Sequence, residues 1–358
     1  MAARKPKPPP RTLWALLLLL LLMAGAAFVA VHVLKTVAKA RPQFQKGMTY
    51  ATWTQEALGS GASDTSLQRL AEAGAEWVAF VPTWYQPQYN STEIAPTGKT
   101  PSDESLRHAI DRARQLRLKV MLKPQLDLSE GAEINWRGEI DFPGDPAGWR
   151  SWFESYGRFL LHYAALAQAQ RVELFCVGTE LMTASVWHEA QWRDLIARVR
   201  KVYQGPLTYA ANWNEEYALI KFWDALDYAG IDPYFPLTDE DRPTLEELKA
   251  AWQPHLAELI RWQQAVDKPV IFTEIGYKSV QGAARAPWED LSGPVDLELQ
   301  RDCYQALLET FWPQPWFSGL YWWHWGTHER MGGEHHRGFT PQNKPAEELL
   351  TAWYRKRR

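Results

Sequence analysis

The sequence predicts an α/β fold: a (β/α)8 barrel (TIM barrel) preceded by a single N-terminal transmembrane helix. Strand-like and helix-like stretches alternate over roughly 310 residues, enough for eight of each. Two of the strand-like stretches end in a glutamate, where a barrel places its active residues. A doubly wound sheet would want a glycine-rich turn after its first strand, and Gly59-Ser60-Gly61 lacks the lysine of a phosphate loop. The barrel is therefore favoured.

The composition indicates a large folded core. Of 358 residues, 46% are hydrophobic and 23% are charged, which excludes a disordered chain. The net charge of −3 and the dispersed basic residues give no support for nucleic-acid binding. Aromatic residues are abundant, with 20 Trp, 14 Tyr and 13 Phe, and those at strand ends would suit the flat apolar faces of sugar rings.

The N-terminal region has the pattern of a membrane anchor. A basic tail, 1–12, precedes residues 13–34, in which His32 is the single polar residue. This stretch is long enough to cross a bilayer as a helix. The positive flank should remain in the cytoplasm, so we expect a signal anchor with the bulk of the chain outside the cytoplasm, periplasmic or extracellular.

The remaining chain divides into a linker, 35–45, and one domain, 46–358. Ala38-Lys39-Ala40 resembles a signal-peptidase site, so cleavage and secretion remain an alternative, and a cytoplasmic barrel is a further one. Cys176 and Cys303 fall in a predicted strand and a predicted helix, and we expect both to be buried free thiols.

The predicted strands are short and apolar, as parallel strands buried on both faces should be. The stretch from Val270 to Tyr277 is typical, because four uncharged residues lead into Glu274 and a glycine, Gly276, follows two positions later. The full set is 47–53, 76–84, 118–125, 172–180, 206–213, 227–234, 270–277 and 319–325.

The predicted helices are marked by caps and by helical spacing of apolar residues. Ser63 or Asp64 would begin the first and Gly74 would end it. Asp145 would cap a later helix, with Pro146 at its first position. The full set is 64–73, 102–117, 146–168, 186–203, a short helix reaching 223, 244–265, 296–311 and 345–354.

Glu180 and Glu274 are the candidate catalytic residues. They end the predicted fourth and seventh strands, so both should point into one mouth of the barrel from opposite sides. Glycoside hydrolysis uses such a pair, because one carboxyl protonates the leaving oxygen while the other attacks the anomeric carbon or activates water. A salt-bridged or capping glutamate is the simpler explanation for either residue alone.

The motifs VGTEL around Glu180, TEIGY around Glu274 and the aromatic run YWWHW resemble glycoside hydrolase family 113, known for β-1,4-mannanases, in clan A of the retaining enzymes. The resemblance covers about residues 45–355. It implies Glu180 as acid/base and Glu274 as nucleophile, with no cofactor. Thr179 stands where most clan members place an asparagine that holds the sugar 2-hydroxyl.

Other residues at strand ends are candidates for substrate binding. Tyr234 should hydrogen-bond Glu274, keeping it ionised and oriented. Alternation along the last strand predicts Trp323 and Trp325 on one face, beneath the reacting sugar, and Trp322 on the other. The further candidates are Trp53, Trp84, Lys123, Gln125, Thr179, Asn212 and Trp213.

Metal binding is not expected. His188-Glu189 lacks the second histidine of a zincin helix, and Glu334, His335 and His336 fit a solvated loop better than a metal site. We therefore predict a retaining β-mannanase whose partners are a glycan substrate and the membrane. The alternatives are the same chemistry on another β-linked cell-envelope or exported glycan, and a non-catalytic glycan-binding barrel.

Overall fold

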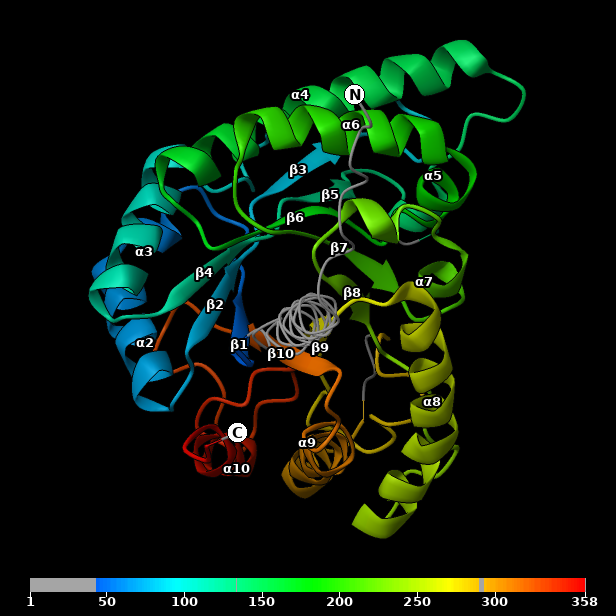
Figure 1. The fold of residues 1–358 in the computed structure, drawn as a ribbon. Coiled ribbons are helices and arrows are strands. Elements are labelled where there is room, and N and C mark those ends of the chain that lie inside the picture. Colours follow the sequence, from blue (N-terminus) through cyan, green and yellow to red (C-terminus); the bar gives the residue numbers. More distant parts are fainter. Residues whose placement is uncertain (1–42, 133, 290–292, 358) are drawn as a thin grey trace, which may run out of the picture. The chain divides into compact units, whose positions relative to one another are not determined.

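The computed structural model describes residues 43–132, 134–289 and 293–357. Residues 44–358 form one compact unit, in which parallel strands close into a barrel surrounded by helices (Figure 1). The predicted (β/α)8 architecture is confirmed. Around the barrel the strands follow the order β1 (Gln45–Tyr50), β10 (Phe317–Trp325), β9 (Val270–Ile275), β8 (Ala229–Asp232), β7 (Leu207–Asn212), β6 (Leu174–Thr179), β4 (Lys119–Leu122) and β2 (Trp77–Phe80).

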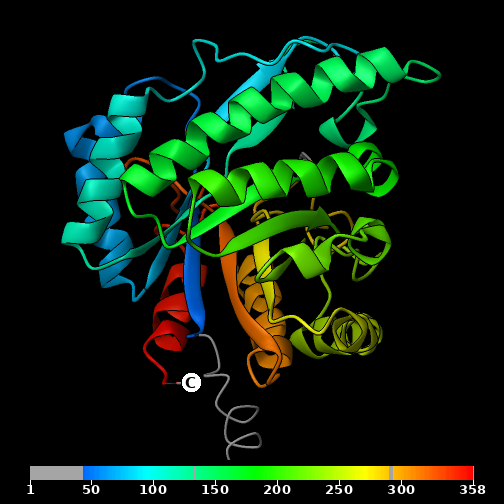
Figure 2. The same ribbon diagram turned by 45° about the horizontal axis from the view of Figure 1, so that its top comes forward.

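The helices lie outside the strands, and α4 and α6 run side by side in both views (Figures 1 and 2). They are α2 (Gly61–Glu72), α3 (Asp103–Gln115), α4 (Pro146–Ala169), α5 (Met182–Trp187), α6 (Glu189–Val202), α7 (Glu216–Leu219), α8 (Leu245–Val266), α9 (Leu297–Phe311) and α10 (Pro345–Tyr354), with short 3-10 turns η1 (Ala57–Gly59), η2 (Arg137–Glu139) and η3 (Trp223–Ala225).

Alternation along each strand divides the core into two parts. In β2, Trp77 and Ala79 belong to a small cluster that also includes Tyr321 of β10, whereas Val78 and Phe80 belong to the large cluster packed under the helices. Successive strand residues point to opposite faces, so the small cluster fills the barrel interior. The interior of the barrel is therefore a packed core, and we expect ligands at its mouth.

Two predicted strands are each interrupted by a proline. The stretch 76–84 forms β2 and then β3 (Thr83–Gln86), and 118–125 forms β4 and then β5 (Gln125–Leu128). Pro82 and Pro124 stand at the breaks, where a residue without an N–H cannot continue the hydrogen-bonded ladder. Strands β3 and β5 instead pair with each other in a separate parallel sheet.

The helix boundaries are mostly as predicted. Asp145 caps α4 with Pro146 at its start, and α10 spans the predicted 345–354. The cap of α2 was predicted wrongly, because Ser60, not Ser63 or Asp64, accepts the hydrogen bond from the Ser63 amide. The predicted helix 186–203 is two helices, α5 and α6, separated at His188, whose backbone is not helical.

The predicted tail, 1–12, and anchor, 13–34, lie outside the described residues, as does most of the linker. Within the described residues, no helix combines the length and apolar character needed to cross a membrane. Cys176 and Cys303 are both buried and free, as predicted.

Candidate active site

A cavity of about 590 Å³ lies at the carboxyl ends of the barrel strands and contains both predicted catalytic glutamates. Glu180 follows β6 directly, and Glu274 is the penultimate residue of β9. Sequence positions almost a hundred residues apart thus meet in one site. The lining residues are Gln125, Trp136, Arg137, Glu180, Asn212, Trp213, Asn214, Tyr234, Glu274, Trp288, Trp323 and Phe339.

Two donors hold the Glu274 carboxylate. The Lys123 ammonium lies 2.6 Å from Oε2, and the Tyr234 hydroxyl donates to Oε1 at 2.8 Å. The hydrogen bond predicted for Tyr234 is therefore present. Lys123 follows β4 and its side chain is fully buried. Burial alone would lower the pKa of Lys123, but the negative charges of Glu274 and Asp232 outweigh it and raise this pKa above its usual value.

Glu180 has a different pair of donors. The Asn212 side-chain amide donates to Oε1 at 2.9 Å, and the Arg137 guanidinium donates to Oε2 at 2.7 Å. Burial raises the pKa of Glu180, and the charge of Glu274 raises it further, while Arg137 acts in the opposite direction. The net result is a carboxyl with a raised pKa, as a general acid requires.

Arg137 was not identified from the sequence. It begins η2, in the long segment between β5 and α4, and donates from Nε to the Leu126 carbonyl at 3.1 Å. Its guanidinium also lies 3.4 Å from Asp127. The sequence feature that could have indicated Arg137 is its position in a loop after a strand, at the carboxyl end of the barrel, where binding residues concentrate. The other lining residues missed for the same reason are Trp136, Asn214, Trp288 and Phe339.

Five of the predicted substrate-binding residues line the cavity: Gln125, Asn212, Trp213, Tyr234 and Trp323. Trp213 stacks on Trp288, with ring centroids 4.9 Å apart and planes 28° apart. Lys123 lies beneath the cavity and reaches it through Glu274. Thr179 is buried in β6 and is not among the lining residues.

Two predicted tryptophans, Trp53 and Trp84, lie elsewhere in the described structure. Trp53 is 46% exposed and packs edge-on against Trp323 and His324, outside the lining of the cavity. Trp84 donates from its indole to the Tyr163 hydroxyl at 2.9 Å, because β3 belongs to the separate sheet and directs this side chain toward α4.

The prediction that Trp323 and Trp325 share a face is wrong. Opposite β1, Met48 pairs with Trp322 and Tyr50 with Trp325, so β10 has one extra residue in this interval. Such a bulge reverses the alternation beyond it. Trp325 is therefore buried and donates to Ser66 of α2 at 3.1 Å, whereas Trp323 lines the cavity and Trp325 does not.

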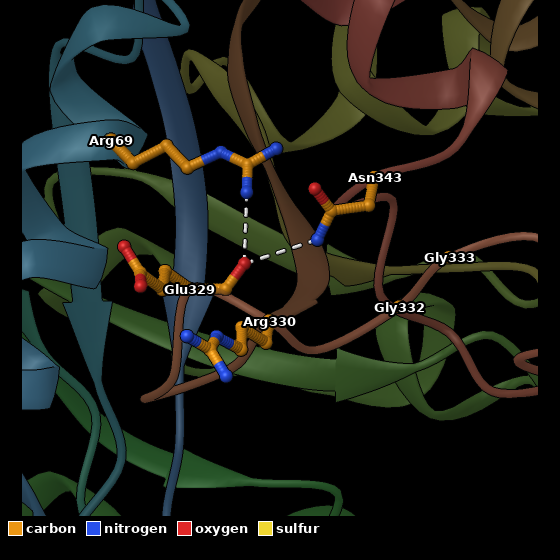
Figure 3. A pocket seen from close by; sticks show the side chains of 6 residues that line it. All are labelled: Arg69, Glu329, Arg330, Gly332, Gly333 and Asn343. Atoms are coloured by element: carbon orange, nitrogen blue, oxygen red, sulfur yellow. Dashed lines mark hydrogen bonds between the residues drawn. The ribbon is translucent and has the colours of Figure 1, made fainter.

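A second cavity, of about 370 Å³, lies between α2 and the segment 329–343 (Figure 3). The Glu329 carbonyl there accepts hydrogen bonds from Arg69 at 2.8 Å and from Asn343 at 3.0 Å. Arg69 is also paired with Glu347 at 2.7 Å. These polar groups are satisfied by one another, and the lining of this cavity includes neither of the predicted catalytic glutamates.

Solved structures that resemble this chain include β-mannanases. A GH113 β-1,4-mannanase is 32% identical, with a TM-score of 0.79 over 88% of this chain and 100% of that one. The GH113 β-mannanase AaManA from Alicyclobacillus acidocaldarius, in complex with ManMIm, is 31% identical, with a TM-score of 0.78 over 87% and 97%. A β-glucuronidase from Ruminococcus gnavus, 14% identical with a TM-score of 0.61 over 88% of this chain and 50% of that one, shares the fold.

A comparison with curated protein sequences gave no match. The family model of Glycoside Hydrolase Family 113, however, matches residues 48–344, which include every barrel strand from β2 to β10 and both glutamates. The chain therefore belongs to glycoside hydrolase family 113 and is a retaining glycoside hydrolase of the β-mannanase type.

Proposed function

We propose that this protein is an endo-acting β-1,4-mannanase in which Glu180 is the acid/base and Glu274 the nucleophile. The observation that supports this assignment is the difference between the two carboxyl groups in one cavity. Burial raises the pKa of Glu180 although the Arg137 guanidinium and the Asn212 amide contact it, whereas Glu274 contacts a fully buried ammonium and a phenol. A general acid needs a raised pKa, and a nucleophile needs donors that hold its carboxylate in place.

In the first step, Glu180 transfers its proton to the glycosidic oxygen as the bond to the anomeric carbon breaks. A Glu274 oxygen forms a bond to that carbon from the opposite face, giving a glycosyl-enzyme ester. In the second step, Glu180, now ionised, takes a proton from water, and the resulting hydroxide displaces Glu274 with net retention. The Lys123 ammonium supplies the opposite charge that an attacking carboxylate needs while it waits for substrate.

The aromatic walls support a carbohydrate polymer as the substrate. Trp136, Trp213, Trp288 and Trp323 line the same cavity as the glutamates, and indole faces suit the C–H faces of pyranose rings. The two related mannanases support mannose as the sugar that this cavity recognises. The basic tail and apolar stretch at the N-terminus support a site of action outside the cytoplasm, on an anchored enzyme or, after cleavage, on a secreted one.

The test is hydrolysis of β-1,4-linked manno-oligosaccharides, beside gluco- and xylo-oligosaccharides, by the full chain and by its Glu274→Ala variant. We expect cleavage of internal bonds in the manno series by wild type alone. Cleavage restricted to another series would leave the mechanism in place and contradict the mannan assignment. Sugar binding without turnover in wild type would contradict catalysis and indicate a glycan-binding barrel.

A further inference from the structure

Behind Glu180 lies a fully buried carboxylate, Glu216, that takes no part in the proposed chemical steps. It is the first residue of α7 and its exposed fraction is 0%. Its Oε1 accepts hydrogen bonds from the Ser185 and Tyr209 hydroxyls, both at 2.6 Å, and its Oε2 accepts from the Asn212 backbone amide at 2.6 Å. A buried carboxylate is costly unless it is satisfied in this way.

Each donor to Glu216 belongs to a segment that frames Glu180. Asn212, whose backbone amide binds Glu216, uses its side-chain amide to hold Glu180 Oε1 at 2.9 Å. The Asn212 side-chain oxygen, Oδ1, accepts a hydrogen bond from the Asn214 backbone amide at 2.7 Å, which directs the side-chain nitrogen of Asn212 toward Glu180. The position of this donor thus depends on the turn that Glu216 closes between β7 and α7.

The second connection passes through Tyr209. Its hydroxyl donates to Glu216 and accepts a hydrogen bond at 2.9 Å from the backbone amide of Leu181. Leu181 is the residue immediately after Glu180 in the chain. Glu180 has a left-handed backbone with φ of 51°, a conformation that a non-glycine residue keeps only when its surroundings impose it. The third donor, Ser185, ties α5 to the same carboxylate.

We propose that Glu216 is a positioning residue for the general acid/base, acting through Asn212 on the Glu180 side chain and through Tyr209 on its backbone. The inference rests on the proposed role of Glu180 but is separate from the identity of the sugar. Loss of the Glu216 carboxylate should displace the Glu180 proton from the glycosidic oxygen, while Glu274, held by Lys123 and Tyr234, keeps its geometry.

The test compares two leaving groups, because a good one needs little protonation. A manno-oligosaccharide depends fully on the acid, whereas dinitrophenyl β-mannobioside releases a stable phenolate. The kcat/KM value reports the glycosylation step for both. We expect Glu216→Gln to lower kcat/KM for the oligosaccharide about 10-fold or more, and for the aryl substrate less than about 3-fold. The loss on the oligosaccharide is smaller than the full contribution of a general acid, about 10²–10⁴-fold, because Glu180 itself is still present.

Tyr209→Phe provides a second variant should Glu216→Gln fold poorly. It removes only the hydroxyl between Leu181 and Glu216, and we expect the same selective loss. Because both variants break one network, the double variant should lose less than the product of the single losses. Glu173→Gln is the matched control, since Glu173 accepts a backbone hydrogen bond from Val120 outside the cavity, and it should show no selective loss.

Equal losses on both substrates, or no loss in either variant, would overturn the positioning role. Glu180→Ala, measured in parallel, separates this failure from failure of the proposed function. If Glu180→Ala is selective and the Glu216 and Tyr209 variants are not, the inference alone is wrong. If Glu180→Ala is itself not selective, the acid/base assignment is wrong and the inference falls with it.

Discussion

The two glutamates of the cavity lie at the carboxyl ends of similar strands, yet the structure holds them in different ways. Glu274 is contacted by Lys123 and Tyr234, and the lysine side chain is fully buried beneath the site. Glu180 is held by an arginine from the segment after β5 and by a side-chain amide that a turn positions. Glu274, the proposed nucleophile, thus contacts a cation buried in the barrel, whereas Glu180, the proposed acid/base, contacts a cation from the long segment between β5 and α4. Two glutamates at the ends of similar strands can therefore have different proposed roles, because different side chains contact them.

The largest expected effect is the difference between removing each carboxyl. Glu274→Ala should lower kcat by at least about 10⁴-fold on every substrate, because no bond to the anomeric carbon can form. Glu180→Ala should lower kcat/KM about 10²–10⁴-fold for oligosaccharides and far less for an aryl glycoside.

Azide distinguishes the two variants further when an aryl glycoside is the substrate. It can replace the missing nucleophile of Glu274→Ala from the α face, giving the α-glycosyl azide. In Glu180→Ala it attacks the glycosyl-enzyme from the β face, giving the β-glycosyl azide. The reverse pattern in product NMR spectra would exchange the two roles.

The next effect concerns the support of Glu274 by the barrel. Lys123→Met leaves a mostly buried carboxylate without its cation, and breaking such a pair costs about 3–5 kcal/mol of unfolding free energy. Denaturant unfolding measures this loss. Lys249→Met, which removes a partly exposed lysine from Glu246 of α8 and Glu309 of α9, should change the stability little. A small effect of Lys123→Met would contradict the role given to this buried pair.

Glu216, which we propose positions Glu180, should make the unfolding free energy of the protein depend on pH. Burial raises the pKa of Glu216 from 4.5 to about 7, although its three hydrogen-bond donors act against this. Between these two pH values the folded protein binds more protons here than the unfolded chain, so stability falls as the pH rises. Above about pH 7 the whole cost of keeping Glu216 ionised in the folded protein is present, and it lowers the unfolding free energy by on the order of 3 kcal/mol.

Glu216→Gln should abolish this part of the pH dependence, because glutamine does not titrate. The measurement is the unfolding free energy of both proteins at pH 4 and at pH 8. We expect the stability of wild type to fall relative to the variant over this range. A constant difference between the two proteins would mean that Glu216 has the same pKa in the folded and unfolded states.

The smallest expected effect lies at the aromatic wall. Trp288 is 46% exposed and stacks on Trp213, so Trp288→Ala should raise KM about 3–10-fold, as the loss of one aromatic contact would, with little change in kcat. Trp187, 76% exposed on α5 and not a lining residue, provides the control. Equal changes in kcat and KM would indicate that Trp288 instead orders the site.

The fold, and the meeting of Glu180 and Glu274 in one cavity, could be predicted from the sequence because both follow from local pattern. Short apolar strands that end in Glu180 and Glu274 specify a barrel edge, and Tyr234 was placed beside Glu274 by strand order alone. Arg137 could not be predicted, since its partners, Asp127 and Glu180, meet it only when the segment after β5 folds over the mouth.

Errors arose where one residue changes the direction of a strand. Pro82 ends the ladder of β2, so Trp84 packs against α4 and not in the mouth. The extra residue in β10 turns Trp325 outward, although strict alternation would place it beside Trp323. Hydrophobic periodicity predicts neither the end of β2 at Pro82 nor the extra residue in β10, because it predicts which face of a sheet a residue occupies only where the strand is regular.

The most direct test of the account is to identify the residue that carries the glycosyl-enzyme. A 2-deoxy-2-fluoro-β-mannosyl substrate with an activated leaving group should form this ester quickly and lose it slowly. Mass spectrometry of the digested protein should then locate the sugar on Glu274, in the peptide that contains TEIGY. A sugar attached to Glu180, or turnover with inversion and no ester at all, would contradict the roles assigned to the two glutamates.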